Sequence, residues 1–472
     1  MTVNEIKVKV TEYVRDHKPV VIGVLVVLGV GIILLGVISA LGGTGSSANN
    51  TPPVTTPIVV PPADTPVDGG SSSQKVINMW GAFFSPEVMA PVIAQYEDDN
   101  PNIKINYTNE VIRNSDINAY RSKIDGIVGS QTATTAPDIF VVDSGWTGSF
   151  VAKSAPADAS ILSAGQLQSE FHDFIVTDFV NSGNVIGVPI WVDNLAIVYN
   201  KKLWTSAGLS EPDNDWIRFA DVQVPALTKK QGSTIQTAGF AAGTDINAEF
   251  WYESLLLLIA QNKLPFEVSG QEGFTDSPDA TQSVNFYKSF NRTGSRSSWS
   301  DTFNPDVAAF LEGKLATYIG PSWRLNDIVR YNEAYNLGLD IGVSALPQLQ
   351  SATQDKANIA NYWGYMVNSA STKSADSWKF LSYLSSKETL QQLQQSYKQQ
   401  NPGHIGFLYP RKDLAATQTT DRYLAEYAKS LDFTVSWYVV DEQKMRSVLR
   451  KVFDGKTLAN IKPEIDAVIK TN

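Results

Sequence analysis

The chain has 472 residues, of which 43% are hydrophobic, and its formal net charge is −10. An acidic balance without a basic stripe argues against nucleic acid as a partner. The sequence has no cysteine, which excludes disulfides, thiolate metal sites and a cysteine nucleophile. Its three histidines lie far apart, which argues against a zinc site. We therefore expect neither a metal nor a cofactor.

Residues 19–41 form a stretch of 23 residues without any charge. As a helix this stretch would be roughly 35 Å long, which is enough to cross a bilayer. Basic residues precede it within residues 1–18, and no charge follows until Asp64. The positive-inside rule then places residues 1–18 in the cytoplasm and the rest of the chain outside. We expect a single transmembrane anchor. The alternative is a cleaved signal peptide, whose apolar core is usually only ~7–15 residues long.

Residues 42–74 are a low-complexity segment rich in Gly, Ser, Thr and Pro. Gly and Ser make such a segment flexible, and Pro stiffens it toward polyproline II. A segment of this composition cannot bury a core. We expect a disordered linker that holds a folded domain, residues 75–472, away from the membrane.

The folded part begins with strands and helices in alternation. Residues 76–79 are an apolar run typical of a strand, and residues 85–99 predict a helix that starts with a Ser-Pro pair. Residues 103–107 alternate as a strand, and residues 119–130 predict a second helix. Residues 138–142, DIFVV, indicate a strand of a parallel sheet that is buried on both faces.

The same alternation continues to the C-terminus. Strands are predicted at residues 185–189 and 196–199. Helices are predicted near residues 250–261, 282–290, 307–312 and 374–385, followed by a mostly helical C-terminal region. Alternating strands and helices indicate an α/β fold, and the length of this part favours two domains or lobes over one core.

Five segments in this order resemble a known family, the extracellular solute-binding proteins of ATP-driven importers, in the group that includes maltose-binding protein. The segments are KVINMWGAFFSPEVMAPVIAQYEDDNPNIKINY, APDIFVVDSGWTGSFVAKSAPADAS, VIGVPIWVDNLAIVYNKKLWTSAGL, FNPDVAAFLEGKLATYIGPSWRLNDI, and IGVSALPQ with NYWGYMVNSASTKSADSWKFLSYLSSKE. No single segment is diagnostic of the family, but the order of the five segments is. In bacteria the family usually carries a cleaved signal peptide or a lipoprotein cysteine, and this chain shows neither clearly.

The resemblance implies a periplasmic-binding-protein-like fold of two lobes with a ligand cleft between them. Lobe 1 would comprise residues 75–192 and 360–412, and lobe 2 residues 195–357 and 415–472. Hinge closure would trap the ligand. The family also implies delivery of a small ligand, here a sugar or oligosaccharide, to the permease subunits of an ABC transporter.

Sugar sites combine hydrogen-bonding side chains with flat aromatic rings, and this chain has 11 tryptophans. Several lie where predicted strands end, in loops that commonly build binding sites. We expect Trp80 to follow the first strand, and Trp323 and Arg324 to end the IGPSWR strand. The candidate ligand-binding residues are Trp80, Phe83, Asp143, Ser144, Trp146, Trp191, Asp193, Asn194, Glu249, Trp251, Trp323, Arg324 and Trp363. The resemblance supports Asp193, Trp323 and the DSGW loop in particular.

Each candidate also has a structural interpretation. A tryptophan in an α/β protein more often packs in the core than against a ligand. Asp193 could instead cap a helix or bridge a hinge, and Arg324 could form a surface salt bridge.

Three other functions stay open. A sugar phosphate or other anion as ligand would need cationic residues, for which the candidates are Arg324, Arg113 and Arg411. An extracellular polysaccharide-acting enzyme would need a carboxylate pair, but no catalytic motif is present, so we expect no enzyme. A sensor ectodomain would need a signalling partner, because residues 1–18 are too few for a signalling domain.

Overall fold

The computed structural model describes residues 74–111, 116–132, 135–264, 273–349, 356–436 and 441–469. Ser71–Asn472 is one compact unit. The expected cytoplasmic segment, the apolar segment 19–41 and nearly all of the linker lie outside the described residues. Among the helices of the described part, none combines the length and the apolar character needed to span a bilayer.

A five-stranded sheet organises the first lobe, in the order β2-β1-β3-β13-β6. Its strands are β1 (Lys75–Ala82), β2 (Ile103–Val111), β3 (Ile139–Asp143), β6 (Gly187–Pro189) and β13 (Trp363–Val367). β1 runs parallel to β2 and β3, whereas β13 is antiparallel to β3 and β6. The C-terminal ends of β1 and β3 and the N-terminal end of β13 therefore lie at the same edge of the sheet. The residues that follow β1 and β3 are thus close to those that precede β13.

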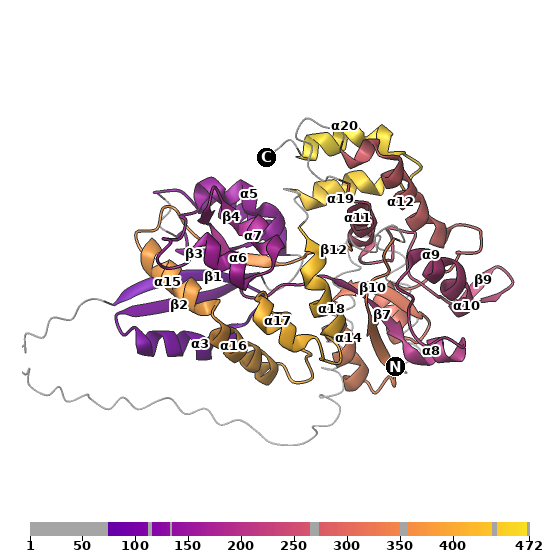
Figure 1. Ribbon diagram of the computed structural model, residues 1–472, viewed down its shortest axis with the longest axis horizontal. Helices are drawn as coiled ribbons and strands as arrows, with labels where there is room; N and C mark the ends of the chain where they lie inside the picture. Colours follow the sequence, from indigo (N-terminus) through magenta and orange to yellow (C-terminus); the bar gives the residue numbers. More distant parts are fainter. Residues whose placement is uncertain are drawn as a thin grey trace, which may run out of the picture. The chain divides into compact units, whose positions relative to one another are not determined.

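Helices cover this sheet because their apolar side chains form a stripe. α3 (Pro86–Asp99) begins at Ser85, whose hydroxyl accepts a hydrogen bond from the Val88 amide, and its buried residues recur at helical spacing. Figure 1 shows α3 beside α16 (Lys387–Gln400), which the chain reaches only after it has returned from the second lobe. The other helices around this sheet include α4 (Ile117–Ile127), α6 (Ala164–Glu170), α7 (Asp173–Phe179) and α15 (Ser374–Leu384).

The second lobe contains a smaller antiparallel sheet, in the order β10-β7-β11. β7 (Leu195–Asn200) lies between β10 (Thr317–Pro321) and β11 (Ile341–Ser344), and all its residues are buried. Its main helices are α8 (Lys201–Ser206), α11 (Trp251–Gln261), α12 (Pro278–Lys288), α13 (Asp306–Leu311) and α14 (Ser322–Ala334). α11 is buried nearly all round, which explains its LLLLIA sequence.

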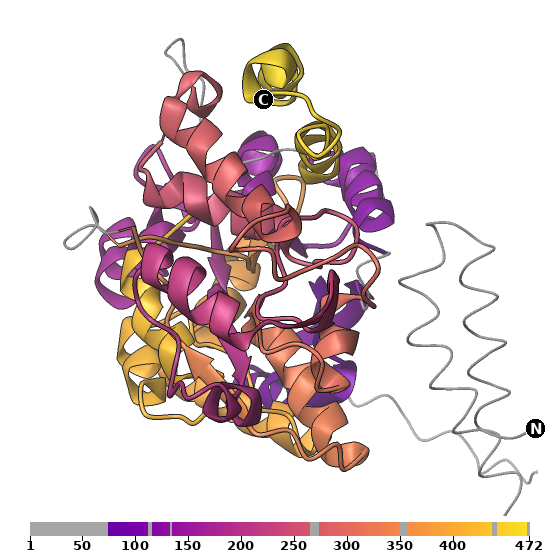
Figure 2. The ribbon, with the colours of Figure 1, turned by 90° about the vertical axis from the view of Figure 1, so that its right-hand side faces the viewer.

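The C-terminal region is mostly helical, as predicted. α17 (Lys412–Gln418) and α18 (Ala425–Ser430) are followed by β14 (Thr434–Val435), which pairs with β12 (Asn358–Ile359). α19 (Glu442–Arg450) and α20 (Leu458–Ile469) then lie next to each other, as Figures 1 and 2 both show. Their buried residues share a hydrophobic cluster with α11 and α12, separate from the cluster around the five-stranded sheet.

The predicted strands and helices are all present, but two local predictions are wrong. Trp80 lies within β1, which continues to Ala82 because it pairs with β2 along its whole length. Trp323 and Arg324 do not end a strand. They lie in the first turn of α14, because β10 ends at Pro321 and a buried carboxylate binds the first amides of the helix.

Candidate ligand-binding site

Four of the predicted aromatic residues form one cluster in lobe 1, although they come from four separate segments. Phe83, which follows β1, contacts Trp191 edge-to-face at 5.9 Å between ring centroids and Trp363 at 5.4 Å. Trp363 in turn contacts Trp146 at 5.0 Å. We call Phe83, Trp146, Trp191 and Trp363 the lobe 1 aromatic group.

The four rings divide into a half-buried pair and a buried pair that supports it. Phe83 and Trp191 are half-buried, whereas Trp146 and Trp363 are only 4% and 3% exposed. Phe83 has a φ of +68°, which is rare for a residue with a side chain and marks a sharp turn after β1. The outer pair can therefore present flat apolar surface to a ligand, and the inner pair holds it in place.

A carboxylate lies at the end of β3, next to this group. Asp143 Oδ1 accepts a hydrogen bond from the Gly145 amide at 2.9 Å, and Oδ2 receives none from the described residues. Burial raises the pKa of Asp143 to about 7, and the nearby charge of Glu442 at the start of α19 raises it further. The neighbouring Ser144 is buried, and its amide donates to the Tyr362 carbonyl at 3.0 Å.

Trp80 stands apart from the lobe 1 aromatic group. It is half-buried, and the Lys123 ammonium lies 3.9 Å from its ring centroid, a cation–π contact. Lys123 also pairs with Glu110 at 2.7 Å. Trp80 therefore has partners within the domain.

A second group of predicted residues lies in lobe 2. The Arg324 guanidinium lies 4.5 Å from the centroid of the Trp323 ring, and it forms ion pairs with Glu249 and with Asp327, the latter at 3.0 Å. The Phe250 ring contacts the Trp323 ring edge-to-face at 5.8 Å between centroids. We call Glu249, Trp323, Arg324 and Asp327 the lobe 2 charged group.

A buried acid supports the lobe 2 charged group. The two carboxylate oxygens of Asp306, which is 2% exposed, accept hydrogen bonds from the amides of Glu249 and Val307 at 2.9 and 2.8 Å. Burial raises the pKa of Asp306 to about 7, and the charge of Glu249 adds to the effect. Asp306 thus fixes the backbone at Glu249.

Asp193 has the bridging role that we considered as an alternative. Its carboxylate accepts hydrogen bonds from the Ser322 amide at 3.0 Å, the Ser322 hydroxyl at 2.8 Å and the Trp323 amide at 3.0 Å. The Asn194 amide adds a fourth at 2.8 Å. The negative charge of Asp193 also interacts favourably with the positive end of the α14 dipole. Asp193 is 2% exposed, and its four hydrogen bonds are all made inside the protein. It therefore connects the segment just before β7 to the start of α14.

Asn194 and Trp251 lie in the interior. The Asn194 side chain is fully buried, and its amide donates to the Tyr427 carbonyl and to the hydroxyls of Ser430 and Thr434. Trp251 is 7% exposed and packs in the core of lobe 2. We therefore leave both residues out of the site proposed below.

Three residues that sequence reasoning missed contribute to these groups. The Arg121 guanidinium in α4 lies 4.9 Å from the Trp146 ring, Asp306 supports Glu249, and Glu442 acts on Asp143. No local pattern distinguishes these charged residues from solvated ones on other helices. Only the packing of distant segments shows that they belong here.

Comparison with known proteins gives the same fold. The cyclic α-maltosyl-1,6-maltose binding protein from Arthrobacter globiformis superimposes with a TM-score of 0.67 at 15% identity, over 84% of this chain and 100% of the other. UgpB from Mycobacterium tuberculosis, in complex with glycerophosphocholine, gives 0.62 at 16% identity, over 84% and 99%. This likeness confirms the expected two-lobed α/β fold.

Sequence comparison identifies the family. The diacetylchitobiose binding protein DasA of Streptomyces coelicolor is 22% identical over 217 residues, which are 45% of this chain. The match spans about half of DasA, 48% of its length. The family model described as bacterial extracellular solute-binding protein matches residues 92–402, well over half of the chain. The chain therefore belongs to the bacterial extracellular solute-binding proteins.

Proposed function

We propose that this protein binds a neutral sugar or oligosaccharide between its two lobes. The lobe 1 aromatic group with Asp143 and Ser144 would form one wall, and the lobe 2 charged group would form the other. The convergence of Phe83, Trp146, Trp191 and Trp363 beside a carboxylate carries this proposal. Aromatic faces pack against the C–H surface of a sugar ring, and carboxylates accept hydrogen bonds from its hydroxyls.

The charges of the described residues favour a neutral ligand over a sugar phosphate. Arg324 is already paired with two carboxylates, and Arg411 pairs with Glu170 in another part of lobe 1. Arg113 lies outside the described residues. Arg121 lies beside Trp146 and acts on Asp143, but the acids Asp143, Glu442, Glu249 and Asp327 outnumber it, so an anion would meet more negative than free positive charge. The names of DasA and of the Arthrobacter protein, which state sugar ligands, support the same ligand class.

Membrane attachment and delivery complete the proposal. Residues 19–41 would anchor the chain in the cell membrane, and residues 42–74 would tether the binding domain outside the cell. Closure of the two lobes around the ligand would present it to the permease subunits of an ABC transporter. Flotation of the full chain with liposomes, lost when residues 19–41 are deleted, would support the anchor. A deletion variant that still floats would contradict it.

Calorimetric titration tests the ligand class. The full chain, kept in detergent because of its apolar segment, is titrated with maltotriose, diacetylchitobiose and glucose 6-phosphate. We expect a neutral sugar to bind, and Trp191→Ala and Trp323→Ala each to weaken binding by about tenfold or more, as for aromatic anchors of an interface.

Tyr335→Ala is the matched control, because Tyr335 is an aromatic residue of lobe 2 that is 49% exposed and outside both groups. Its binding should equal that of the unmodified chain. Binding of glucose 6-phosphate alone, or neutral-sugar binding that neither tryptophan variant weakens, would refute the proposed site.

A further inference from the structure

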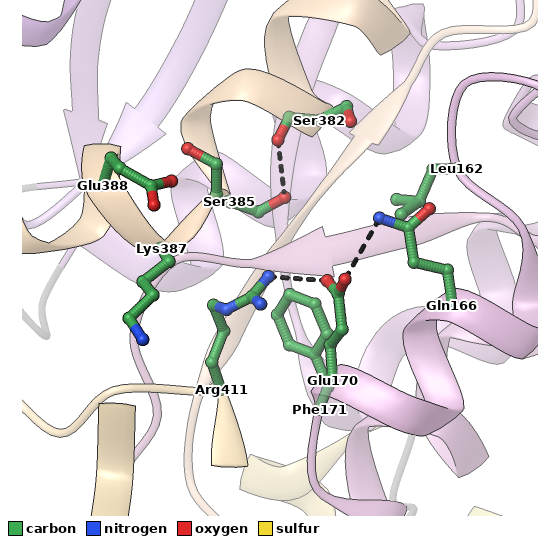
Figure 3. A pocket seen from close by; sticks show the side chains of 10 residues that line it. Leu162, Gln166, Glu170, Phe171, Ser382, Ser385, Lys387, Glu388 and Arg411 are labelled. Atoms are coloured by element: carbon green, nitrogen blue, oxygen red, sulfur yellow. Dashed lines mark hydrogen bonds and ion pairs between the residues drawn. The ribbon is translucent and has the colours of Figure 1, made fainter. Parts of the chain in front are cut away.

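A cavity of about 310 Å³ lies in lobe 1, lined by the segment around α6, the end of α15, the start of α16 and Arg411 (Figure 3). This volume is at the lower end of the range of small-molecule pockets, roughly 300–1,000 Å³. None of its lining residues belongs to the lobe 1 aromatic group or the lobe 2 charged group. The cavity is therefore separate from the site proposed above.

Arg411 provides a fixed donor to the cavity. Its side chain is 11% exposed, and its Nη1 and Nε pair with Glu170 at 2.6 Å and Asp413 at 3.2 Å. The guanidinium also lies 5.5 Å from the centroid of the buried Phe171 ring. Its Nη2 makes no hydrogen bond with any residue in the described part of the chain. Two ion pairs thus hold the guanidinium in place and leave one nitrogen for a ligand.

Oxygen atoms with spare acceptor capacity line the rest of the cavity. Ser382 Oγ donates to the Ile161 carbonyl and Ser385 Oγ donates to the Ser382 carbonyl, each at 3.3 Å. These hydroxyl protons are committed, so the oxygens remain as acceptors. Figure 3 shows Gln166 pointing toward Glu170, to which its amide nitrogen donates at 3.3 Å, and its carbonyl oxygen is left as a further acceptor.

We propose that this cavity binds a small neutral polyhydroxylated molecule of monosaccharide size. Each hydroxyl of such a molecule both donates and accepts, which matches one guanidinium donor among several oxygen acceptors. An anion fits less well, because the serine protons are committed and the carboxylates of Glu170 and Glu388 line the same space. Burial of a cation would be opposed by Arg411 and Lys387, and the polar lining disfavours an apolar ligand.

Saturation-transfer NMR with D-glucose as the probe tests this site in the full chain. Arg411→Gln removes the free donor, and we expect about tenfold weaker binding, as for the loss of one charged hydrogen bond. Gln166→Ala removes one acceptor at an exposed position and should weaken binding about threefold. Gln166→Ala serves as the test variant if Arg411→Gln fails to fold. Arg296→Gln is the matched control, because Arg296 also pairs with a carboxylate, that of Asp221, but lies in lobe 2.

The Trp323→Ala variant separates this site from the one between the lobes. Glucose binding that persists in Trp323→Ala and is weakened by Arg411→Gln or Gln166→Ala supports the cavity, whether or not oligosaccharides bind elsewhere. The proposal is overturned by any of three results. These are no glucose binding, glucose binding that only Trp323→Ala weakens, and displacement of glucose by inorganic phosphate, which would indicate an anion site.

Discussion

Asp143→Asn should stabilise the protein at alkaline pH while it weakens ligand binding. The folded state holds the Asp143 carboxylate partly buried, and Oδ1 accepts its hydrogen bond from the Gly145 amide. The carboxamide of Asn keeps that acceptor and removes the charge. Because Oδ2 receives no hydrogen bond from the described residues, the variant loses no observed contact.

The magnitude follows from the raised pKa. The pKa of Asp143 is about 7 in the folded protein, raised by burial and then by Glu442, against 3.8 as its ordinary value. The folded state therefore binds more protons than the unfolded state between these two values, so charged Asp143 destabilises the fold above pH 7. The penalty fades as pH falls toward 3.8. A shift of about 3 units corresponds to at most about 4 kcal/mol, and we expect about 2 kcal/mol because the side chain keeps some contact with water.

Urea unfolding of the full chain, followed by circular dichroism at pH 8 and at pH 4, measures this difference. Asp143→Asn should raise the free energy of unfolding at pH 8 by about 2 kcal/mol and change it little at pH 4. Calorimetry should show weaker sugar binding by the same variant, the usual trade-off at a binding site. Equal destabilisation at both pH values would refute the reasoning, since it would show that the fold needs the carboxylate itself.

Three further predictions concern buried polar groups that connect distant segments. Asn194→Ala removes the hydrogen bonds that the buried side-chain amide donates to the Tyr427 carbonyl and to the hydroxyls of Ser430 and Thr434. The variant should lower the free energy of unfolding by about 2 kcal/mol in urea, whereas the exposed control Asn184→Ala should change it by less than about 0.5 kcal/mol. Arg446→Met leaves the carboxylate of Glu253, 13% exposed, without its cation and should cost about 3 kcal/mol. The ion pair between Lys451, at the end of the same helix, and Glu464 is the exposed control, since the two side chains are 41% and 46% exposed. Lys451→Met should cost less than about 1 kcal/mol, and equal costs for Arg446→Met and Lys451→Met would contradict this explanation. Burial lowers the pKa of His172 to about 4, partly offset by Asp432, so its ring should titrate near pH 4 by NMR. The stability that this neutral ring contributes is present above pH 6.5 and lost as pH falls toward 4, and an ordinary titration near 6.5 would show that the ring is not desolvated.

The strands and helices could be predicted from the sequence because their signals are local. The DIFVV run that became β3 and the Ser-Pro start of α3 have the composition and spacing of these elements within a few residues. The order of such elements, together with the family resemblance, was enough to identify the two-lobed fold. Errors arose where one residue decides a boundary, as at Pro321, where the chain changes from strand to helix.

The roles of the site residues depend on contacts that no local pattern contains. Asp193 was a candidate ligand residue by sequence, but its bonds to Ser322 join positions 129 residues apart and turn it into a helix cap. Likewise, only packing shows that Trp146 and Trp363 support the half-buried Phe83 and Trp191. The sequence by itself determined the elements, their order and the family, since hydrophobic periodicity and turn residues act over short distances. Tertiary structure alone decided which polar and aromatic side chains are used up inside the protein and which remain free for a ligand, because burial and hydrogen bonding are set by segments that meet only in the folded chain.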